Sequence, residues 1–304
     1  MFELRGIVPP VVTPFDTRGD VDTASLGGLV EYLIAGGVHG LFVLGSSGEG
    51  ASLDSAERAT VVRTVTDAAR GRVPVLVGVI DTSLRRISEY VGMAREFRAD
   101  AVVATPTFYF QSNQSEAIHF FRMIAKSSAL PVVAYNLPQL VKVSLEPVTV
   151  SQLAREGTIR GIKDSSPDFS MTREMVVQAT AVPGFSVLTG LESMVDLGIA
   201  MGMSGAVPGL ANVAPRHYVD IYDCARRGEF ERARALQEKM IVLFGIKHQG
   251  RSGQSHSAGA LSGFKAALKL LGVIATSRMH DPMQGLTEKE EEGVKDVMRE
   301  TGWL

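Results

Sequence analysis

Lys163 lies at the end of a short apolar run, Ile159–Ile162, and is followed by Asp164 and two serines. A lysine that ends a buried strand loses its hydration, which favours the neutral amine over the charged ammonium. A neutral amine can attack a carbonyl carbon, and the protonated imine that forms stabilises an enamine on the substrate. The alternative is a lysine that extends to water or pairs with Asp164. We expect Lys163 to act as a nucleophile toward a carbonyl substrate.

A second candidate site is the segment Gly45-Ser46-Ser47-Gly48-Glu49, which directly follows the apolar run Gly40–Leu44. Hydroxyl groups and backbone N–H groups between glycines can bind an anion. No lysine follows at the position that a nucleotide-binding loop requires. A substrate carboxylate is therefore the expected guest, with Ser46, Ser47 and Gly48 as its binding residues. The alternative is an ordinary tight turn with hydrated serines.

Two further side chains lie at or beyond the ends of apolar runs. Tyr135 ends the run Leu130–Tyr135, which precedes that of Lys163, so its phenol could relay protons to and from the substrate. Glu192 follows the run Phe185–Leu188 and could bind substrate hydroxyl groups. The alternatives are a packed tyrosine whose hydroxyl bonds to the backbone, and a glutamate that only favours the start of the next helix.

The composition excludes several classes of protein. The 304 residues carry a net charge of −2, which gives no basis for binding nucleic acid or an acidic membrane surface. The lone Cys224 cannot form a disulfide within the chain, and the six histidines show no metal-binding spacing. No apolar stretch approaches the length of a membrane span, and the first residues do not resemble a signal peptide. We expect a soluble cytoplasmic protein that needs no metal and no cofactor.

Eight short apolar runs recur along the chain, each of a length typical of a strand buried on both faces. They are Gly6–Val12, Gly40–Leu44, Val73–Val79, Ala101–Ala104, Leu130–Tyr135, Ile159–Ile162, Phe185–Leu188 and Gly205–Val207. Segments of helical periodicity separate them, and Asp54 to Glu57 forms a capping pattern before one such segment, Ser55–Arg70. Eight strands alternating with helices over about 250 residues predict a closed (β/α)8 barrel of the α/β class. An open, doubly wound sheet is the alternative.

The last part of the chain has the pattern of helices, at Phe230–Lys247, Gly259–Leu271 and Thr287–Arg299. No linker rich in proline or serine separates these segments from the rest, so we expect a single domain. Residues 1–228 would form the barrel, and residues 229–304 would form a helical extension of it. In such barrels the chemistry lies beyond the carboxyl ends of the strands, where the candidate residues are expected to meet.

Three of these segments together resemble motifs of a known family, the Schiff-base pyruvate lyases related to dihydrodipicolinate synthase and N-acetylneuraminate lyase. Gly45–Glu49 is similar to the family's G-[TS]-[TS]-G-E loop. Tyr135–Pro138 is similar to its Y-N-x-P motif, and Gly161–Asp164 to its G-I-K-[DE] motif. Each motif is weak alone, but their order along the chain makes the resemblance specific, and it extends over nearly the whole sequence.

The resemblance implies a role for each matching residue. Lys163 would form the imine, and Tyr135 would transfer protons. Ser46 and Ser47 would hold the carboxylate of a 2-keto acid, with Ser46 also in the proton relay. The backbone carbonyl of Val207 would lie near the bound keto acid. The resemblance also implies a homotetramer.

The chain departs from the family pattern at two positions. Synthases of the family carry an arginine two residues after the proline of Y-N-x-P, where this chain has Leu140, with Lys142 nearby. Without that cation, a second substrate carboxylate loses a charge-assisted hydrogen bond of about 1.5–3 kcal/mol. The family's relay tyrosine is replaced by Phe108, and Tyr109 is the next candidate for that catalytic role. The segment His248–Ala258 is either a hydrated loop or a cover over the active site.

We therefore expect an aldolase or dehydratase that acts on pyruvate or a 2-keto-3-deoxy sugar acid, with Glu192 and Leu140 in the substrate site. The first alternative is dihydrodipicolinate synthase, against which Leu140 argues. A second alternative is a non-catalytic protein that binds keto acids, which the presence of both Lys163 and Tyr135 disfavours. A serine hydrolase using Ser47 is disfavoured because no histidine is placed to act as its base.

Overall fold

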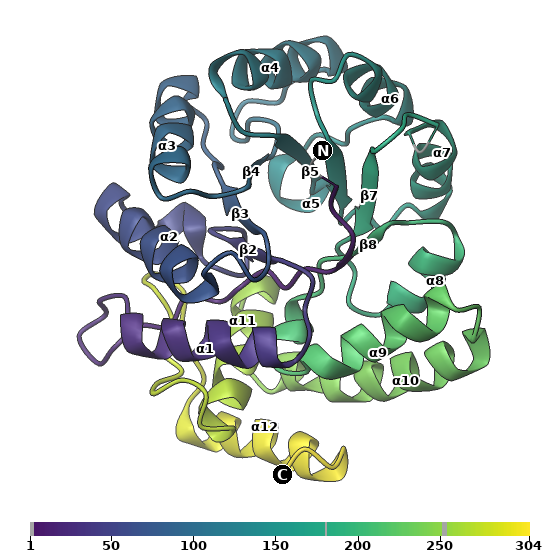
Figure 1. Cartoon of the computed structure of the whole chain (residues 1–304). Helices are drawn as coiled ribbons and strands as arrows, with labels where there is room; N and C mark the ends of the chain where they lie inside the picture. Colours follow the sequence, from purple (N-terminus) through teal and green to yellow (C-terminus); the bar gives the residue numbers. More distant parts are fainter. Residues whose placement is uncertain (1–2, 180, 251–253) are drawn as a thin grey trace.

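The computed structural model describes residues 3–179, 181–250 and 254–304, and within these ranges it contains eight parallel strands inside a ring of helices (Figure 1). The strands are β1 (Gly6–Ile7), β2 (Leu41–Val43), β3 (Val75–Gly78), β4 (Ala101–Ala104), β5 (Val132–Asn136), β6 (Gly161–Asp164), β7 (Ser186–Thr189) and β8 (Gly205–Ala206). Each falls on one of the predicted apolar runs, although β6 lies two residues later and therefore contains Lys163.

The strands close into a barrel. Their hydrogen-bonded order is β1-β8-β7-β6-β5-β4-β3-β2, and β1 and β2 meet at the remaining gap. There Phe42 N donates to Pro9 O at 3.0 Å, and Val11 N donates to Phe42 O at 2.8 Å. Because both edges of the sheet are bonded to each other, the predicted (β/α)8 barrel is confirmed and the open doubly wound sheet is not formed.

Two apolar clusters occupy the two faces of the strands. The inner cluster fills the barrel and includes Val8, Phe42, Val103, Val133 and Leu188. The larger outer cluster lies between the strands and the helices that surround them. Burial on both faces explains why the strands have continuous apolar sequences and do not alternate between polar and apolar residues.

The helices that cover the barrel follow the strands in turn. They are α1 (Thr23–Ala35), α2 (Ser55–Ala69), α3 (Leu84–Glu96), α4 (Gln114–Ser127), α5 (Pro138–Val141), α6 (Pro147–Arg155), α7 (Phe169–Ala179), α8 (Val195–Ala200) and α9 (Pro215–Arg226). The predicted capping pattern is confirmed at α2, where Asp54 and Glu57 bond to each other's backbone N–H groups. Short 3₁₀ segments lie at Gly50–Ser52 and Gly209–Asn212.

Three helices, α10 (Phe230–Leu243), α11 (His256–Leu270) and α12 (Glu288–Glu300), follow the barrel as predicted. In Figure 1 they lie on one side of it, close to α1 and α9. A 3₁₀ segment, Phe244–His248, leads from α10 toward α11. The expected boundary between residues 228 and 229 falls in the turn between α9 and α10, and the division itself stays a prediction.

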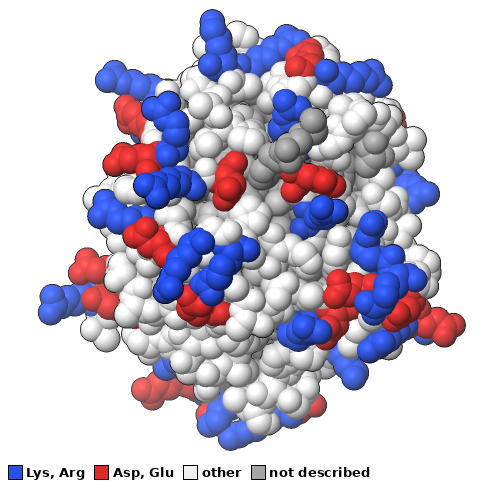
Figure 2. Space-filling model, in the orientation of Figure 1, with Lys and Arg blue, Asp and Glu red and all other residues white. Residues whose placement is uncertain are grey.

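Charged side chains of both signs are interspersed over the face seen in Figure 2, in keeping with the net charge of −2. None of the helices in the described ranges combines the length and the apolar character that crossing a membrane requires.

Candidate active site

A cavity of about 440 Å³ lies at the carboxyl ends of the barrel strands. Its wall brings together seven of the residues predicted for the site, namely Ser46, Ser47, Tyr135, Leu140, Lys163, Glu192 and Val207. Gly48 and Tyr109, which were also predicted, do not line it. The remaining wall comes from residues that follow β2, β5, β6, β7 and β8, from Pro10, from α11 and from Met283.

Lys163 and Tyr135 are neighbours across β5 and β6, where their Cα atoms are paired in register. Lys163 Nζ lies 4.1 Å from the centre of the Tyr135 ring and 5.3 Å from that of Phe42. Lys163 is only 6% exposed, so it does not extend to bulk water. Among the residues that the structure describes, none accepts a hydrogen bond from its Nζ. The amine is thus held between aromatic faces with its donors free for a ligand.

Asp164, which could have paired with Lys163, bonds elsewhere. Its carboxylate accepts from Asn136 Nδ2 at 2.9 Å, from Ser166 N at 3.1 Å and from the hydroxyl of Thr172. Asn136 Oδ1 in turn accepts from Leu145 N at 2.9 Å. The motif residues beside Tyr135 and Lys163 therefore link β5 to β6 behind the cavity and hold the two strand ends in one register.

Gly190, the first residue after β7, leaves space for the lysine. A Cβ atom at this position would lie 2.8 Å from Lys163 Cε and 1.9 Å from Ser165 Oγ. Both distances are shorter than any van der Waals contact, so only glycine fits without moving its neighbours. Gly190 N also donates to Asp164 O at 2.7 Å, which ties β7 to β6 at this point.

The loop Gly45–Glu49 forms a tight turn whose polar backbone groups are largely bonded within the protein. Glu49 N donates to Ser46 O at 3.1 Å, and Thr13 Oγ1 donates to Gly48 O at 2.7 Å. Within the described ranges the Ser46 and Ser47 hydroxyls have no protein partner, and both residues face the cavity. The loop thus presents two free hydroxyls to the same cavity as Lys163, where they can donate hydrogen bonds to the carboxylate of a bound substrate.

Glu192 also lies in the cavity wall. Its Oε1 accepts from Gly209 N at 2.9 Å, and its backbone oxygen accepts from Tyr218 Oη and Gln237 Nε2. Burial raises the pKa of the Glu192 carboxyl, against the opposing effects of its hydrogen bonds and of Lys163. The side chain is therefore fixed in place and retains a proton to higher pH than an ordinary glutamate. It precedes α8 without capping it.

The residues at the two departures from the family pattern lie in different places. Tyr109 is 88% exposed, has a φ of 79° and contacts Phe110 edge-on, so within this chain it does not reach the cavity. Phe108 lines a smaller pocket of about 130 Å³ that also touches Ser46 and Leu140. Lys142 is exposed and does not line the cavity, and within the described ranges its Nζ donates to the Gln139 carbonyl at 3.5 Å, so it does not take the place of the missing arginine.

C-terminal residues form one wall of the cavity, and the sequence indicated this position only for the segment His248–Ala258. From the segment His248–Ala258, residues 251–253 lie outside the described residues, but His256 and Ser257 line the cavity. Two residues of this segment thus contribute to the wall of the site, and a cover over the site formed by the whole segment stays a prediction. Beside these two polar residues, the apolar side chains of Leu261, Phe264 and Met283 form the rest of this wall. No group of His, Cys, Asp or Glu side chains in the described ranges is arranged to hold a metal ion.

Known proteins resemble this chain over nearly its full length. A probable 2-dehydro-3-deoxy-D-pentonate aldolase of Escherichia coli is 34% identical over 80% of this chain and 81% of its own. The solved dihydrodipicolinate synthase of Bacteroides thetaiotaomicron is 34% identical, with a TM-score of 0.93 over 99% of this chain and all of the other. The Escherichia coli prophage protein YagE, solved with pyruvate, is 29% identical, with a TM-score of 0.92 over 99% of both chains. Residues 3–301 match the Dihydrodipicolinate synthetase family, and the chain therefore belongs to this family of lyases.

Proposed function

We propose that this protein forms an imine between Lys163 and a 2-keto acid, and that it cleaves or dehydrates the bound substrate. The observation that carries the proposal is the buried Lys163 amine, which lies 4.1 Å from the Tyr135 ring in a cavity that also presents the Ser46 and Ser47 hydroxyls. An amine that has no acceptor among the described residues, beside a phenol and two serine hydroxyls, suits attack on the carbonyl of a keto acid. The solved complex of the related YagE protein with pyruvate supports the same ligand class.

The reaction would begin with the substrate carboxylate bound to the Ser46–Ser47 loop. The Lys163 nitrogen adds to the keto carbon, and protons relayed by Tyr135, with Ser46 as its partner, allow the keto oxygen to leave as water. In aldol cleavage, loss of the proton from the C4 hydroxyl breaks the C3–C4 bond and releases an aldehyde. The electron pair of that bond enters the imine as an enamine. Protonation at C3 and hydrolysis then return free Lys163 and pyruvate. In dehydration, the imine instead loses a proton from C3 with the C3–C4 bond intact, and the enamine that forms expels the C4 hydroxyl, which takes up a proton and leaves as water.

The substrate class that we propose is the 2-keto-3-deoxy sugar acids. Lys163 is the only lysine or arginine among the described residues that line the cavity, so a second carboxylate would find no arginine or further lysine there. Glu192 is placed to bind hydroxyl groups, and the pentonate aldolase relative supports a hydroxylated chain. Leu140 occupies the wall where synthases of the family have an arginine.

Dihydrodipicolinate synthase is the second candidate, favoured by the close similarity to the Bacteroides enzyme. It requires a site for the carboxylate of an amino-acid semialdehyde, which the Leu140 wall does not offer. Comparing turnover of 2-keto-3-deoxy sugar acids with turnover of pyruvate plus aspartate semialdehyde would separate the two. A non-catalytic keto-acid binder stays the alternative of another class, and it would bind substrate without turning it over.

We also propose a cytoplasmic homotetramer, as the family resemblance implies. The exposed Tyr109 and Phe110 side chains support an oligomer, because two adjacent aromatic rings gain from burial against another subunit. The role of Tyr109 as a proton relay would then depend on its reaching a neighbouring site. Sedimentation of the wild type and of Tyr109→Ala tests this, since dissociation is expected in the variant.

The test of the imine is reductive trapping. The protein is incubated with pyruvate, treated with sodium borohydride and analysed by mass spectrometry of the intact chain and its peptides. A pyruvate-sized adduct is expected on the Lys163 peptide, absent in Lys163→Ala and retained in Lys142→Ala, which changes an exposed lysine nearby. The proposal fails if no adduct forms with pyruvate or with a panel of 2-keto acids.

A further inference from the structure

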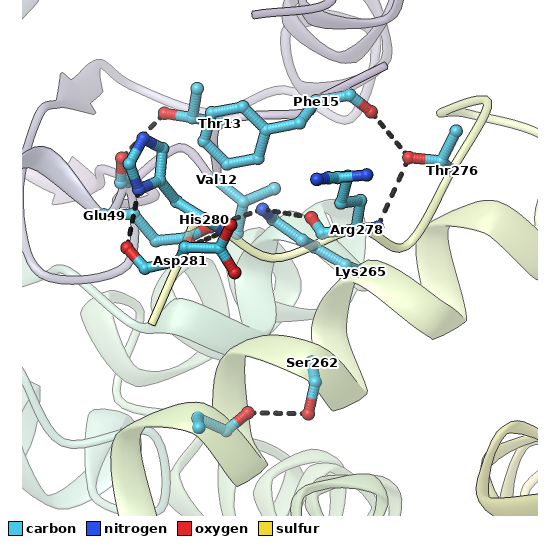
Figure 3. Close-up of polar contacts among 12 residues, drawn as sticks. Val12, Thr13, Phe15, Glu49, Ser262, Lys265, Thr276, Arg278, His280 and Asp281 are labelled. Carbon is cyan, nitrogen blue, oxygen red and sulfur yellow. Dashed lines mark hydrogen bonds and ion pairs between the residues drawn. The ribbon is translucent and has the colours of Figure 1, made fainter. Parts of the chain in front are cut away.

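A buried ion pair lies at the edge of the cavity, between Glu49 of the Gly45–Glu49 loop, which lines the cavity, and Lys265 of α11 (Figure 3). Both side chains are 0% exposed, and Lys265 Nζ is in direct hydrogen-bond contact with Glu49 Oε1. The same ammonium donates to Arg278 O at 2.8 Å and lies 4.3 Å from the centre of the Phe15 ring. Lys265 does not line the cavity, so it cannot contact a substrate there.

The second oxygen of Glu49 is also engaged. It accepts from His280 N at 2.8 Å, on the segment that follows α11. Glu49 itself adopts a φ of 55°, a left-handed conformation that costs free energy in any residue with a side chain. A glycine would relieve that strain, so the glutamate side chain must contribute something that a glycine could not. Its contribution is the connection from the loop to α11 and His280.

Glu49 lies two residues after Ser47 and three after Ser46, the residues that present the free hydroxyls. Its backbone N–H donates to Ser46 O at 3.1 Å, so the position of Glu49 sets the position of Ser46. On the other side, Thr13 holds the Gly48 carbonyl at 2.7 Å, and Arg58 Nε holds the Leu53 carbonyl at 3.2 Å. The loop is thus anchored at Ser46, Gly48 and Glu49, and the segment that follows it is anchored at Leu53, whereas the Ser46 and Ser47 residues face the cavity.

Stability alone does not explain why this pair is charged. Burial lowers the pKa of Lys265 to about 8, which shows that the protein bears a desolvation cost at this position. A well-packed apolar pair is often as stable as a buried ion pair, or more so. Apolar contacts do not fix the orientation of a side chain as hydrogen bonds do. Here Lys265 bonds to Glu49 and to Arg278 O, and Glu49 also bonds to His280 N, so the loop is held in one orientation.

We propose that Lys265 is a positioning residue for this active site, which through Glu49 holds Ser46 and Ser47 in the geometry that binds the carboxylate of the substrate. The C-terminal helix α11 thereby determines affinity for the carboxylate without touching it. This role rests on the proposed function, because it concerns the carboxylate site of the same keto acid.

The test compares Lys265→Met with Lys269→Met, which removes the next lysine along α11, a surface residue paired with Glu291 at 2.8 Å. The half-saturating concentration for borohydride trapping is measured with pyruvate and with methyl pyruvate, a neutral ester that lacks the carboxylate. For Lys265→Met we expect the half-saturating concentration of pyruvate to rise about tenfold, because the substrate carboxylate loses about one charge-assisted hydrogen bond. The half-saturating concentration of methyl pyruvate should change little. We expect KM for the cleaved substrate to rise more than kcat falls, and Lys269→Met to behave as the wild type.

A second variant, Glu49→Gln, keeps an acceptor for His280 N and tests the same role if Lys265→Met does not fold. An unchanged half-saturating concentration for pyruvate in a folded variant would overturn the proposal. So would an equal loss of pyruvate and methyl pyruvate binding, because that result indicates general disruption of the cavity. Absence of trapping in the wild type would instead refute the imine itself, and this role with it.

Discussion

Gly190 provides the sharpest test of how closely the Lys163 side chain is fitted to its surroundings. In Gly190→Ala the new Cβ would lie 2.8 Å from Lys163 Cε, whereas carbon atoms in contact are about 3.5–4.0 Å apart. Lys163 Cε would have to move by roughly 0.7–1.2 Å to remove this overlap. A displacement of this size at a reacting group costs about 100-fold in rate, or about 2.7 kcal/mol in the activation free energy.

The assay is kcat/KM for cleavage of a 2-keto acid, together with the rate of borohydride trapping at Lys163. The backbone of Gly190 is not in the left-handed region, so alanine brings no conformational strain of its own. Gly92→Ala in α3 is the matched control, because its Cβ would meet nothing within 4 Å and activity should be unchanged. If Gly190→Ala kept kcat/KM within about threefold of the wild type, Lys163 would not require the placement that we infer.

Three further predictions concern groups buried around the site. Asp164→Ala should lower the free energy of unfolding, measured by urea titration, by about 3–5 kcal/mol, because several buried donors lose their acceptor. A loss under about 1 kcal/mol would contradict the role inferred for Asp164 in linking β5 to β6. Lys265 has a usual pKa of 10.5 that burial lowers to about 8 in the folded chain, so between these values the unfolded chain binds more protons. The free energy of unfolding should therefore rise from pH 8 toward 10.5, by up to about 1.4 kcal/mol per pH unit, and this contribution should be missing from Lys265→Met. Glu192→Gln keeps an acceptor for Gly209 N but cannot titrate. Because burial raises the pKa of Glu192, the variant should lose a pH-dependent step in kcat/KM above the usual glutamate range. A pH profile identical to that of the wild type would show that substrate binding does not depend on the protonation state of Glu192.

The barrel could be predicted from the sequence because each strand is buried on both faces and is therefore a visible apolar run. The adjacency of Lys163 and Tyr135 followed from the same pattern, since consecutive parallel strands place their carboxyl ends together. The limits of the strands were less accurate. β1 is regular only over Gly6–Ile7, because Pro9 and Pro10 lack the N–H groups that a longer ladder needs.

The rest of the site could not be predicted because it depends on contacts between distant segments. The wall formed by Leu261, Phe264 and Met283 comes from α11 and the segment after it, whose sequence resembles that of any packed helix. The contact between Lys265 and Glu49 likewise has no local pattern. The direction of Tyr109 depends on a turn with positive φ, which a tyrosine does not signal in the sequence.

The separation of 216 positions between Glu49 and Lys265 has a consequence for synthesis on the ribosome. The loop and most of the barrel strands leave the ribosome well before α11 does, so Glu49 is at first without its cation. A carboxylate without a partner does not stay buried among apolar groups. In the growing chain the loop should therefore remain open to water, and the carboxylate site would be among the last parts of the molecule to form.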